Sequence, residues 1–361
     1  MKSEIKLTKT NQSRLSEVDF DNIPFGRVFS DHMFMCDFRN GQWENPRIVP
    51  FDYLRMHPAA MVLHYGQAIF EGMKASVSVD GVPFLFRPEL HAKRLNASAE
   101  RMCMPTFPED LFVEALHQLI GLDKAWIPPA EGSALYVRPL MFANDEFIGV
   151  KPSQNYTFLI LTGPVGPYYP KPVSLIAESK YIRAAYGGVG EAKTAGNYAA
   201  SLLPARLANE KGYDQVLWLD SQEFKYIQEV GTMNIFFVID GKVITPETDG
   251  CILRGITRDS ALHLLRDHGY DVEVRKISID EVVAAHKAGK LQEVFGTGTA
   301  AVVANVNRIA YNDLVMELPP VETHRVAAFV KHEINGIRNG TIEDKFGWLV
   351  PVKATEAIVN A

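Results

Sequence analysis

A proline-rich segment, GPVGPYYPKP, lies near the middle of the chain between Gly163 and Pro172. Four of its ten residues are proline and two are glycine, so neither a helix nor a central strand is expected to run through it. The whole chain has 361 residues, which is long enough to form two hydrophobic cores. The segment therefore predicts a connection between two domains.

Strand and helix patterns are mixed on both sides of this segment and do not strictly alternate. The dipeptides Asp80-Gly81 and Asp240-Gly241 each lie between strand-like runs, which is typical of hairpins. Helical patterns are found at 88–102, 109–122, 255–269, 280–289 and 322–340, and strand patterns at 134–142, 155–163 and 215–220. We predict a mixed α/β (α+β) protein with an N-terminal arm at 1–22, a small α/β domain at 23–162, an interdomain loop at 163–176 and a larger C-terminal domain at 177–361.

The composition excludes several classes of function. The formal net charge is -6, so a basic nucleic-acid-binding face is not expected. No apolar run approaches the roughly 18 residues that a membrane span requires, and the polar N-terminus does not resemble a signal peptide. The three cysteines form no CxxC pair, so the sequence predicts neither a disulfide framework nor a metal site. We expect a cytoplasmic protein that binds no nucleic acid and no membrane.

The segment GGVGEAKTAGNYAAS, from Gly187 to Ser201, places one lysine among small residues. An ordinary lysine amine has a pKa near 10.4 and is a poor nucleophile at neutral pH. A lysine becomes reactive when it is partly desolvated or forms a Schiff base with a carbonyl cofactor, and both cases need open space around the amine. The glycines and alanines around Lys193 provide that space, and Tyr198 follows five positions later. A flexible loop with a solvated lysine is an equally good explanation of this segment taken alone.

Three further segments carry groups that suit a phosphorylated, heteroaromatic ligand. Glu229 precedes a glycine turn and an apolar strand, where a buried carboxylate could hold a proton on a ring nitrogen; a surface glutamate is the ordinary alternative. Gly255, Ile256 and Thr257 begin a helix, whose free N–H groups favour phosphate, although Thr257 could simply be an N-cap. The sequence GTGT ending at Thr299 offers more N–H and hydroxyl donors. On helix pattern alone, Arg94 is a solvated surface residue.

Seven motifs together resemble the branched-chain amino acid aminotransferases, pyridoxal phosphate enzymes of fold type IV. The fold that this resemblance implies is the two-domain, D-amino acid aminotransferase-like architecture, and the motifs extend over nearly the whole chain. They occur in the family's order: YGQAIFEGMKA (65–75), RPELHAKRL, YVRPLMF, GGVGEAKTAGNYAAS, EVGTMNIFFVI, GITRDS and EVFGTGTA.

The resemblance implies a pyridoxal 5′-phosphate site in the larger domain. Lys193 is similar to the catalytic lysine that forms the internal aldimine, and Tyr198 to the tyrosine that hydrogen-bonds the phenolic oxygen of the cofactor. Glu229 matches the carboxylate that pairs with the pyridine nitrogen and makes the ring an electron sink. The remaining implied cofactor residues are Arg94, Ile256, Thr257 and Thr299 at the phosphate, and Thr232 on the same side of the site.

The resemblance also implies a pocket that accepts both branched apolar side chains and glutamate. Tyr136 and the N–H groups of Thr299 and Ala300 would hold the α-carboxylate, and Arg138 would meet the γ-carboxylate of glutamate or 2-oxoglutarate. The apolar walls would come from Phe25, Tyr65, Phe70 and Tyr168, with Ile148 and Val150 of a second subunit. Without the resemblance, plain core packing would be the preferred explanation of Phe70 and Tyr136. The resemblance therefore implies a homodimer at minimum.

The implied reaction is the reversible, ping-pong transfer of the amino group of L-leucine, L-isoleucine or L-valine to 2-oxoglutarate. Two other activities of the same fold, those of a D-amino acid aminotransferase and an aminodeoxychorismate lyase, would keep Lys193, Glu229 and the phosphate-binding residues. The YVRP strand and the long YGQAIFEGMKA segment argue against both. A non-enzymatic protein that binds the cofactor or scaffolds a dimer is the remaining alternative.

Overall fold

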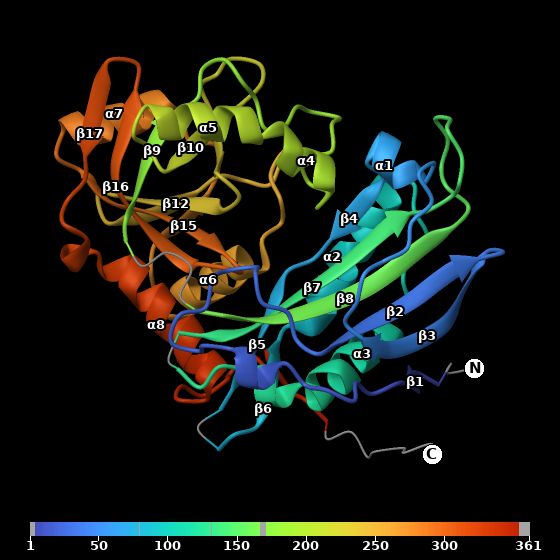
Figure 1. Ribbon diagram of the computed structural model, residues 1–361. Helices are drawn as coiled ribbons and strands as arrows, with labels where there is room; N and C mark the ends of the chain where they lie inside the picture. The colour runs from blue at the N-terminus through green and yellow to red at the C-terminus, as the bar shows by residue number, and fades with distance from the viewer. Residues whose placement is uncertain (1–3, 79, 131, 167–170, 354–361) are drawn as a thin grey trace. The chain divides into compact units, whose positions relative to one another are not determined.

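The computed structural model describes residues 4–78, 80–130, 132–166 and 171–353. The chain divides into two compact units (Figure 1). The first consists of Met1–Tyr168 and Gly336–Ala361, and the second consists of Tyr169–Asn335. Each unit contains its own mixed sheet of nine strands. The predicted mixed α/β class is confirmed, whereas the domain limits of 1–22, 23–162, 163–176 and 177–361 stay a prediction.

The sheet of the first unit is antiparallel except at one edge, where β1 and β3 run parallel. The short strand β4 (Ala68–Phe70) pairs with β7 outside the main path. In sheet order, the other strands are β1 (Lys6–Leu7), β3 (Gln42–Pro50), β2 (His32–Arg39), β8 (Tyr156–Val165), β7 (Ala134–Ala143), β5 (Met73–Val77), β6 (Pro83–Phe86) and β18 (Leu349–Pro351).

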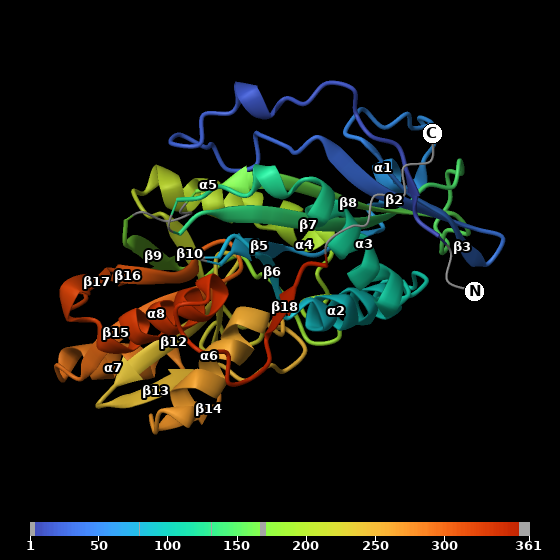
Figure 2. The same ribbon diagram turned by 90° about the horizontal axis from the view of Figure 1, so that it is seen from below.

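Two helices, α2 (Pro88–Arg101) and α3 (Glu109–Leu122), cover one face of this sheet (Figure 2). Pro88 is suited to the first turn of α2 because that position has no intrahelical N–H bond to lose. Leu95 of α2 and Phe112 of α3 pack with Phe34 and Phe158 of the sheet in one buried core. The shorter helical elements are α1 (Met61–Tyr65), η1 (Leu15–Glu17) and η2 (Lys124–Trp126).

The sheet of the second unit combines parallel and antiparallel pairs. Strand β9 (Val173–Ala177) runs parallel to both of its neighbours, β10 and β16. Strand β17 (Leu314–Glu317) pairs with β16 beside the main path. In sheet order, the other strands are β11 (Ile227–Val230), β10 (Gln215–Leu219), β16 (Val302–Tyr311), β15 (Leu291–Gly298), β12 (Asn234–Ile239), β13 (Lys242–Thr245) and β14 (Val272–Val274).

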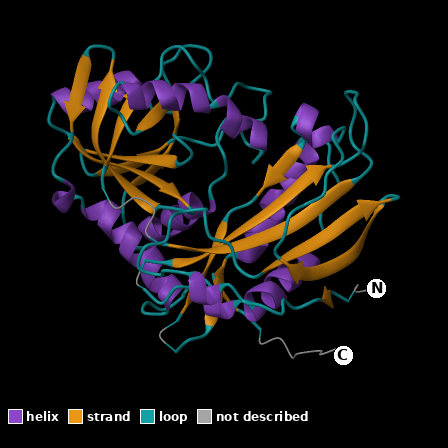
Figure 3. Cartoon of the chain, in the orientation of Figure 1, coloured by secondary structure: helices purple, strands orange, loops and turns teal. Residues whose placement is uncertain are grey.

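Three helices of the second unit, α5, α6 and α7, pack against strands of its sheet (Figure 3). Ile279 and Val282 of α7 join the same buried core as Leu217 and Ile235 of the strands. None of the helices in the described part of the chain is both long and apolar enough to cross a membrane. The helical elements are α4 (Ala195–Ala200), α5 (Leu202–Glu210), α6 (Ile256–Asp267), α7 (Ile279–Lys287), η3 (Val321–Thr323) and α8 (Arg325–Asn339).

The structure confirms both predicted hairpins, β5–β6 and β12–β13, and corrects several element limits. Strand β8 continues to Val165, two residues beyond the expected end, because Pro164 lies opposite Leu135 of β7. The last helix begins at Arg325 because η3 replaces the expected first turn. The sequence patterns missed the β2–β3 hairpin and β18, the strand that follows α8.

Candidate active site

In the second unit, the lysine segment leads into the short helix α4, which carries Tyr198. The Lys193 Nζ lies 2.8 Å from the Tyr198 hydroxyl oxygen. Asn197 fixes the loop, since its Nδ2 donates to the carbonyl oxygens of Val189 (2.8 Å) and Ala192 (2.9 Å). The amine is thus partly buried and directed at a phenol rather than free in solvent.

Glu229 lies in β11 and is buried, at 2% exposure. Its Oε1 accepts hydrogen bonds from the backbone N–H of Leu253 at 2.8 Å and from Asn234 Nδ2 at 3.3 Å. Burial raises the pKa of Glu229, while the nearby charges of Arg183 and Lys193 act in the opposite direction.

Arg183 is a site residue that the sequence reasoning missed. Its Nε forms a 2.8 Å ion pair with Glu229 Oε2. Its Nη1 donates to the carbonyl oxygen of Cys251 at 2.8 Å and to that of Gly190 at 3.3 Å. Gly190 has no room for a side chain, because a Cβ atom there would lie 2.5 Å from both Ala184 Cβ and the Cys251 oxygen. A lone arginine ten residues before the lysine carries no pattern that would have revealed this role.

Asn234, the first residue of β12, joins Glu229 to two neighbouring segments of this unit. Asn234 pairs with Thr297 of β15, and its Nδ2 donates to the carbonyl oxygen of Leu253 at 2.9 Å. Thr232 is exposed in the turn before β12, whereas Thr299 and Ala300 follow the end of β15. The Thr297 hydroxyl is buried, and among the described residues it has no hydrogen-bond partner.

Helix α6 begins at Ile256, three residues after Leu253, whose carbonyl oxygen accepts the hydrogen bond from Asn234. Gly255 is its N-cap and offers no side-chain hydrogen bond to the first turn. The N–H groups of Ile256 and Thr257 therefore lack an intrahelical acceptor, as the first N–H groups of any helix do. Such a helix start favours a phosphate through both these donors and the helix dipole.

In the first unit, Arg94 is held in a buried ionic cluster with Glu71 and His91. Arg94 Nε and Nη2 donate to the two oxygens of Glu71 at 2.7 and 2.8 Å, and His91 Nδ1 lies 2.7 Å from Glu71 Oε2. Burial alone would raise the pKa of Glu71, but Arg94 and His91 hold it well below its ordinary value. Arg94 is thus an oriented cation and not the solvated residue that its helix pattern suggests. Glu71 lies within the YGQAIFEGMKA motif. Its ion pairs with Arg94 and His91 could not be predicted from the spacing of these residues in the sequence.

The first unit also brings together Phe25, Phe70, Tyr136 and Arg138. The Arg138 guanidinium carbon lies 4.6 Å from the centroid of the Phe70 ring, and its Nη2 donates to the Tyr136 hydroxyl at 2.8 Å. The Phe25 and Tyr136 rings meet edge to face, with centroids 5.4 Å apart. Arg138 Nε is buried and has no hydrogen-bond partner among the described residues. A guanidinium group with a buried, unused donor among aromatic rings is suited to a carboxylate.

Other predicted substrate residues lie at the surface of the first unit. Tyr65 is 40% exposed at the end of α1, Ile148 is 66% exposed and Val150 is 91% exposed. Tyr168 lies outside the described residues. The roles assigned to the residues of both units therefore stay predictions.

The donor set of the second unit fits pyridoxal 5′-phosphate. It offers an amine beside a phenol, a buried carboxylate for a ring nitrogen, an uncapped helix start for a phosphate and a buried hydroxyl without a partner among the described residues. In the described part of the chain, no group of three or more histidine, cysteine or acidic side chains is arranged to hold a metal ion.

Residues 68–309 match the family described as amino-transferase class IV. This match covers more than half of the chain, so the chain belongs to the class IV aminotransferases. Within that class it belongs to the branched-chain amino acid aminotransferase family. It is 49% identical over 354 residues to branched-chain-amino-acid aminotransferase 2 of Bacillus subtilis (strain 168), with 97% of each chain covered.

Solved structures of the same family share this fold. The branched-chain amino acid aminotransferase from Escherichia coli is 28% identical, with a TM-score of 0.73, and the match covers 90% of this chain and 99% of that one. The T.th. branched-chain amino acid aminotransferase is also 28% identical, with a TM-score of 0.72 over 88% of this chain and 98% of its own. That structure is a complex with N-(5′-phosphopyridoxyl)-L-glutamate.

Proposed function

We propose that this chain binds pyridoxal 5′-phosphate and reversibly transfers the amino group of L-leucine, L-isoleucine or L-valine to 2-oxoglutarate. The products are the branched 2-oxo acid and L-glutamate. The observation that carries this proposal is the Lys193 amine, 2.8 Å from the Tyr198 hydroxyl, in the same unit as the buried Glu229. The branched-chain amino acids named for the relatives, and the phosphopyridoxyl-glutamate in the T.th. complex, support it.

When bound, pyridoxal 5′-phosphate supplies an electron sink for the charge that remains after the substrate Cα loses its proton. Lys193 Nζ would hold the cofactor aldehyde, and its amine would carry the proton that the substrate Cα loses. Tyr198 orients this amine through its hydroxyl group. Glu229, fixed by Leu253 N–H and Arg183, holds a proton at the ring nitrogen. The uncapped start of α6 and Thr299 would bind the phosphate. The family resemblance assigns Arg94 to the phosphate as well.

We assign substrate recognition to the aromatic and guanidinium cluster of the first unit. Phe25 and Phe70 provide apolar walls for a branched side chain. Arg138 binds the γ-carboxylate of glutamate or 2-oxoglutarate, and its buried Nε, without a partner among the described residues, supports this role. Tyr136 is assigned to the α-carboxylate. The family resemblance assigns the N–H groups of Thr299 and Ala300 to the same group. One pocket can then accept an apolar side chain or a second carboxylate.

We further propose that the chain works as a homodimer. Phe147, Ile148 and Val150 form an exposed apolar loop, with exposed fractions of 44%, 66% and 91%. Leu63 and Tyr65 of α1 add further exposed apolar surface. Neighbouring exposed apolar side chains of this kind are typical of an interaction surface. The loop is assigned to the substrate pocket of the second subunit.

The role of Lys193 is tested by the substitution Lys193→Ala. We expect the visible absorbance of the bound cofactor to change and amino transfer from L-leucine to fall by several orders of magnitude, because the proton carrier is lost. Lys180→Ala is a matched control, since Lys180 is exposed in the same unit. Full amino transfer by Lys193→Ala would overturn the assignment.

The substrate class is tested by the first half-reaction, followed through the cofactor spectrum. L-Leucine should convert the spectrum, whereas D-alanine and aminodeoxychorismate should not. Conversion by D-alanine or by aminodeoxychorismate instead would support the other activities of the fold. A protein that stays colourless with added cofactor would support the non-enzymatic alternative.

A further inference from the structure

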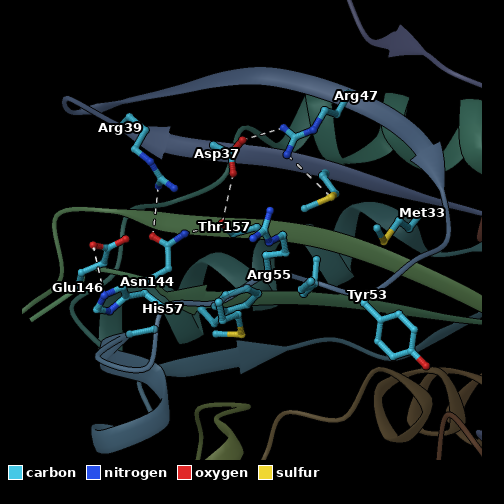
Figure 4. A pocket seen from close by; sticks show the side chains of 15 residues that line it. Met33, Asp37, Arg39, Arg47, Tyr53, Arg55, His57, Asn144, Glu146 and Thr157 are labelled. Atoms are coloured by element: carbon cyan, nitrogen blue, oxygen red, sulfur yellow. Dashed lines mark hydrogen bonds and ion pairs between the residues drawn. The ribbon is translucent and has the colours of Figure 1, made fainter.

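A cavity of about 400 Å³ lies wholly within the first unit, outside the proposed active-site residues (Figure 4). It is bounded by strands β2, β3 and β8, by the segment 53–57 and by the residues after β7. We call it the arginine cavity. Its polar lining consists of Asp37, Arg39, Arg47, Tyr53, Arg55, His57, Asn144, Glu146 and Thr157, and its apolar lining of Met33, Met35, Leu54, Met56, Ala60 and Phe142.

The lining carries more positive than negative charge. Three guanidinium groups face two carboxylates, so the formal charge is 3 − 2 = +1 even with His57 neutral. Arg47 forms a 2.7 Å ion pair with Asp37, which leaves Glu146 as the other anion. Glu146 lies 4.0 Å from His57, at the limit of an ion pair. The cavity therefore holds guanidinium charge that its own carboxylates do not neutralise.

Arg39 and Arg55 are the sources of this charge. Arg39 Nη1 donates to neutral oxygens, those of Phe38, Asn144 and Tyr156 at 2.7, 3.3 and 3.0 Å. These bonds fix the guanidinium group without cancelling its charge. No carboxylate among the described residues forms an ion pair with Arg39 or Arg55. In Figure 4, Arg39 reaches toward Asn144 and Arg47 toward Asp37.

Part of the lining is apolar. Met33, Met35 and Met56 contribute flexible thioether side chains, and Phe142 contributes a ring. Methionine-lined surfaces adapt to apolar groups of different shape. Small-ligand sites typically combine such an apolar wall with a few fixed polar groups in a cavity of about 300 to 1,000 Å³.

We propose that the arginine cavity binds a small organic acid with one carboxylate and a compact apolar body. Arg39 and Arg55 bind the carboxylate through charge-assisted hydrogen bonds, and the methionine wall receives the apolar body. Inorganic anions satisfy the guanidinium groups but leave the apolar wall in contact with water. This site is separate from the cluster of Phe70, Tyr136 and Arg138, and it does not depend on the proposed function.

The test measures binding of 4-methylpentanoate, a branched carboxylate with no amino or oxo group at C2, to the full-length holoenzyme by isothermal titration calorimetry. Because this acid also resembles the proposed substrates, we expect two binding events per chain. Arg55→Gln should weaken one event by about tenfold, because a charge-assisted bond contributes on the order of 1.5 kcal/mol. The double variant Arg39→Gln/Arg55→Gln should abolish that event.

Three controls separate binding at this site from binding at the active site and from a general loss of charge or stability. Arg138→Gln should weaken the other event and leave the arginine cavity intact. Arg206→Gln replaces an exposed arginine of α5 and should change neither event. Thermal unfolding of Arg55→Gln should match the unsubstituted protein because Arg55 is exposed.

Two ligand arms test the chemical class. Inorganic phosphate and the neutral 4-methylpentanamide should both bind at least tenfold more weakly at this site than 4-methylpentanoate. Equal binding of phosphate would overturn the apolar part of the proposal, and equal binding of the amide would overturn the role of the arginines. A single binding event that Arg138→Gln removes would overturn the site altogether, whether or not the chain catalyses amino transfer.

Discussion

At the scale of single residues, the ion pair between Arg183 and Glu229 has the largest expected effect on the cofactor site. Removing one partner of a buried ion pair leaves an uncompensated charge, which costs about 3 to 5 kcal/mol. In Arg183→Gln, Glu229 should therefore favour its protonated form, and the apoprotein should bind pyridoxal 5′-phosphate at least tenfold more weakly. A fluorescence titration of the apoprotein with the cofactor measures this change.

Two further variants serve as controls for the titration of Arg183→Gln. Arg183→Lys keeps the charge and should recover part of the affinity, although it cannot bond to all three of the groups that the guanidinium reaches. Arg206→Gln on the surface of α5 should bind the cofactor normally. Unchanged affinity in Arg183→Gln would show that Glu229 needs no counter-charge.

A second residue-scale prediction concerns Glu71. It compares the affinities for pyridoxal 5′-phosphate and for pyridoxal, which lacks the phosphate. Glu71→Gln removes the bidentate carboxylate that orients Arg94. We expect the affinity of the apoprotein for pyridoxal 5′-phosphate to fall about tenfold, while the affinity for pyridoxal, which has no phosphate, stays within twofold. Equal losses for the two ligands would show that the cluster serves only to stabilise the fold. Glu100→Gln, at an exposed position of α2, is the matched control.

The same substitution should change the acid sensitivity of the fold. The pKa of Glu71 is lowered in the folded state, so its contribution to stability is present above the ordinary carboxyl range and is lost as the pH falls through and below that range. Glu71→Gln cannot make this contribution at any pH. Urea unfolding followed from about pH 5 down to about pH 2 should therefore give a steeper loss of stability for the unsubstituted protein than for the variant.

At the scale of elements, α8 depends on a carboxylate that lies on a strand. The buried Glu293 of β15 accepts hydrogen bonds from the N–H groups of Arg325, Val326 and Ala327 at 2.6, 3.0 and 2.9 Å. These are the first N–H groups of the helix, where a negative charge also interacts favourably with the helix dipole. Glu293→Gln should lower the free energy of unfolding by about 1 to 2 kcal/mol.

Chemical denaturation with Glu322→Gln as the control tests this role, since Glu322 is an exposed residue of η3. A variant as stable as the unsubstituted protein would mean that water caps the helix equally well. Cofactor binding should be unchanged in either case.

Elements with strong local signals were predictable from the sequence. The limits of α3 agree with its apolar periodicity, and both Asp-Gly turns join the expected strands. By contrast, the β2–β3 hairpin turns at Asn40-Gly41, a signal that was present but not used, with Gly41 at a positive φ of 80°. The strand β18 has only three residues and forms through pairing with β6, which no local pattern could indicate.

The candidate site shows the same division. Lys193, Tyr198 and Glu229 lie in motifs that the family resemblance makes recognisable. Arg183 and Glu71 act through side-chain pairs over 46 and 23 residues of sequence, and such pairs follow from tertiary structure alone. Residues that belong to family motifs are thus easier to assign from the sequence than the residues that pair with them.

At the scale of the whole molecule, the exposed apolar loop of Phe147, Ile148 and Val150 bears on assembly. Burying two carboxylates at an interface costs free energy because each loses its hydration. Ile148→Asp/Val150→Asp should therefore weaken a dimer that buries this loop. Sedimentation velocity across a range of protein concentrations should show a dimer for the unsubstituted protein and a tenfold or greater increase in the dissociation constant for the variant. A monomer at all concentrations, for both proteins, would refute the homodimer.

The contacts of Arg183 also have a consequence for the protein without bound cofactor. One guanidinium group ties together the carboxylate of β11, the glycine before the lysine and the chain at Cys251. These ties need no cofactor, because every partner belongs to the polypeptide itself. We therefore expect these contacts of Arg183 to form in the apoprotein, so that cofactor binding does not have to wait for this part of the site to fold.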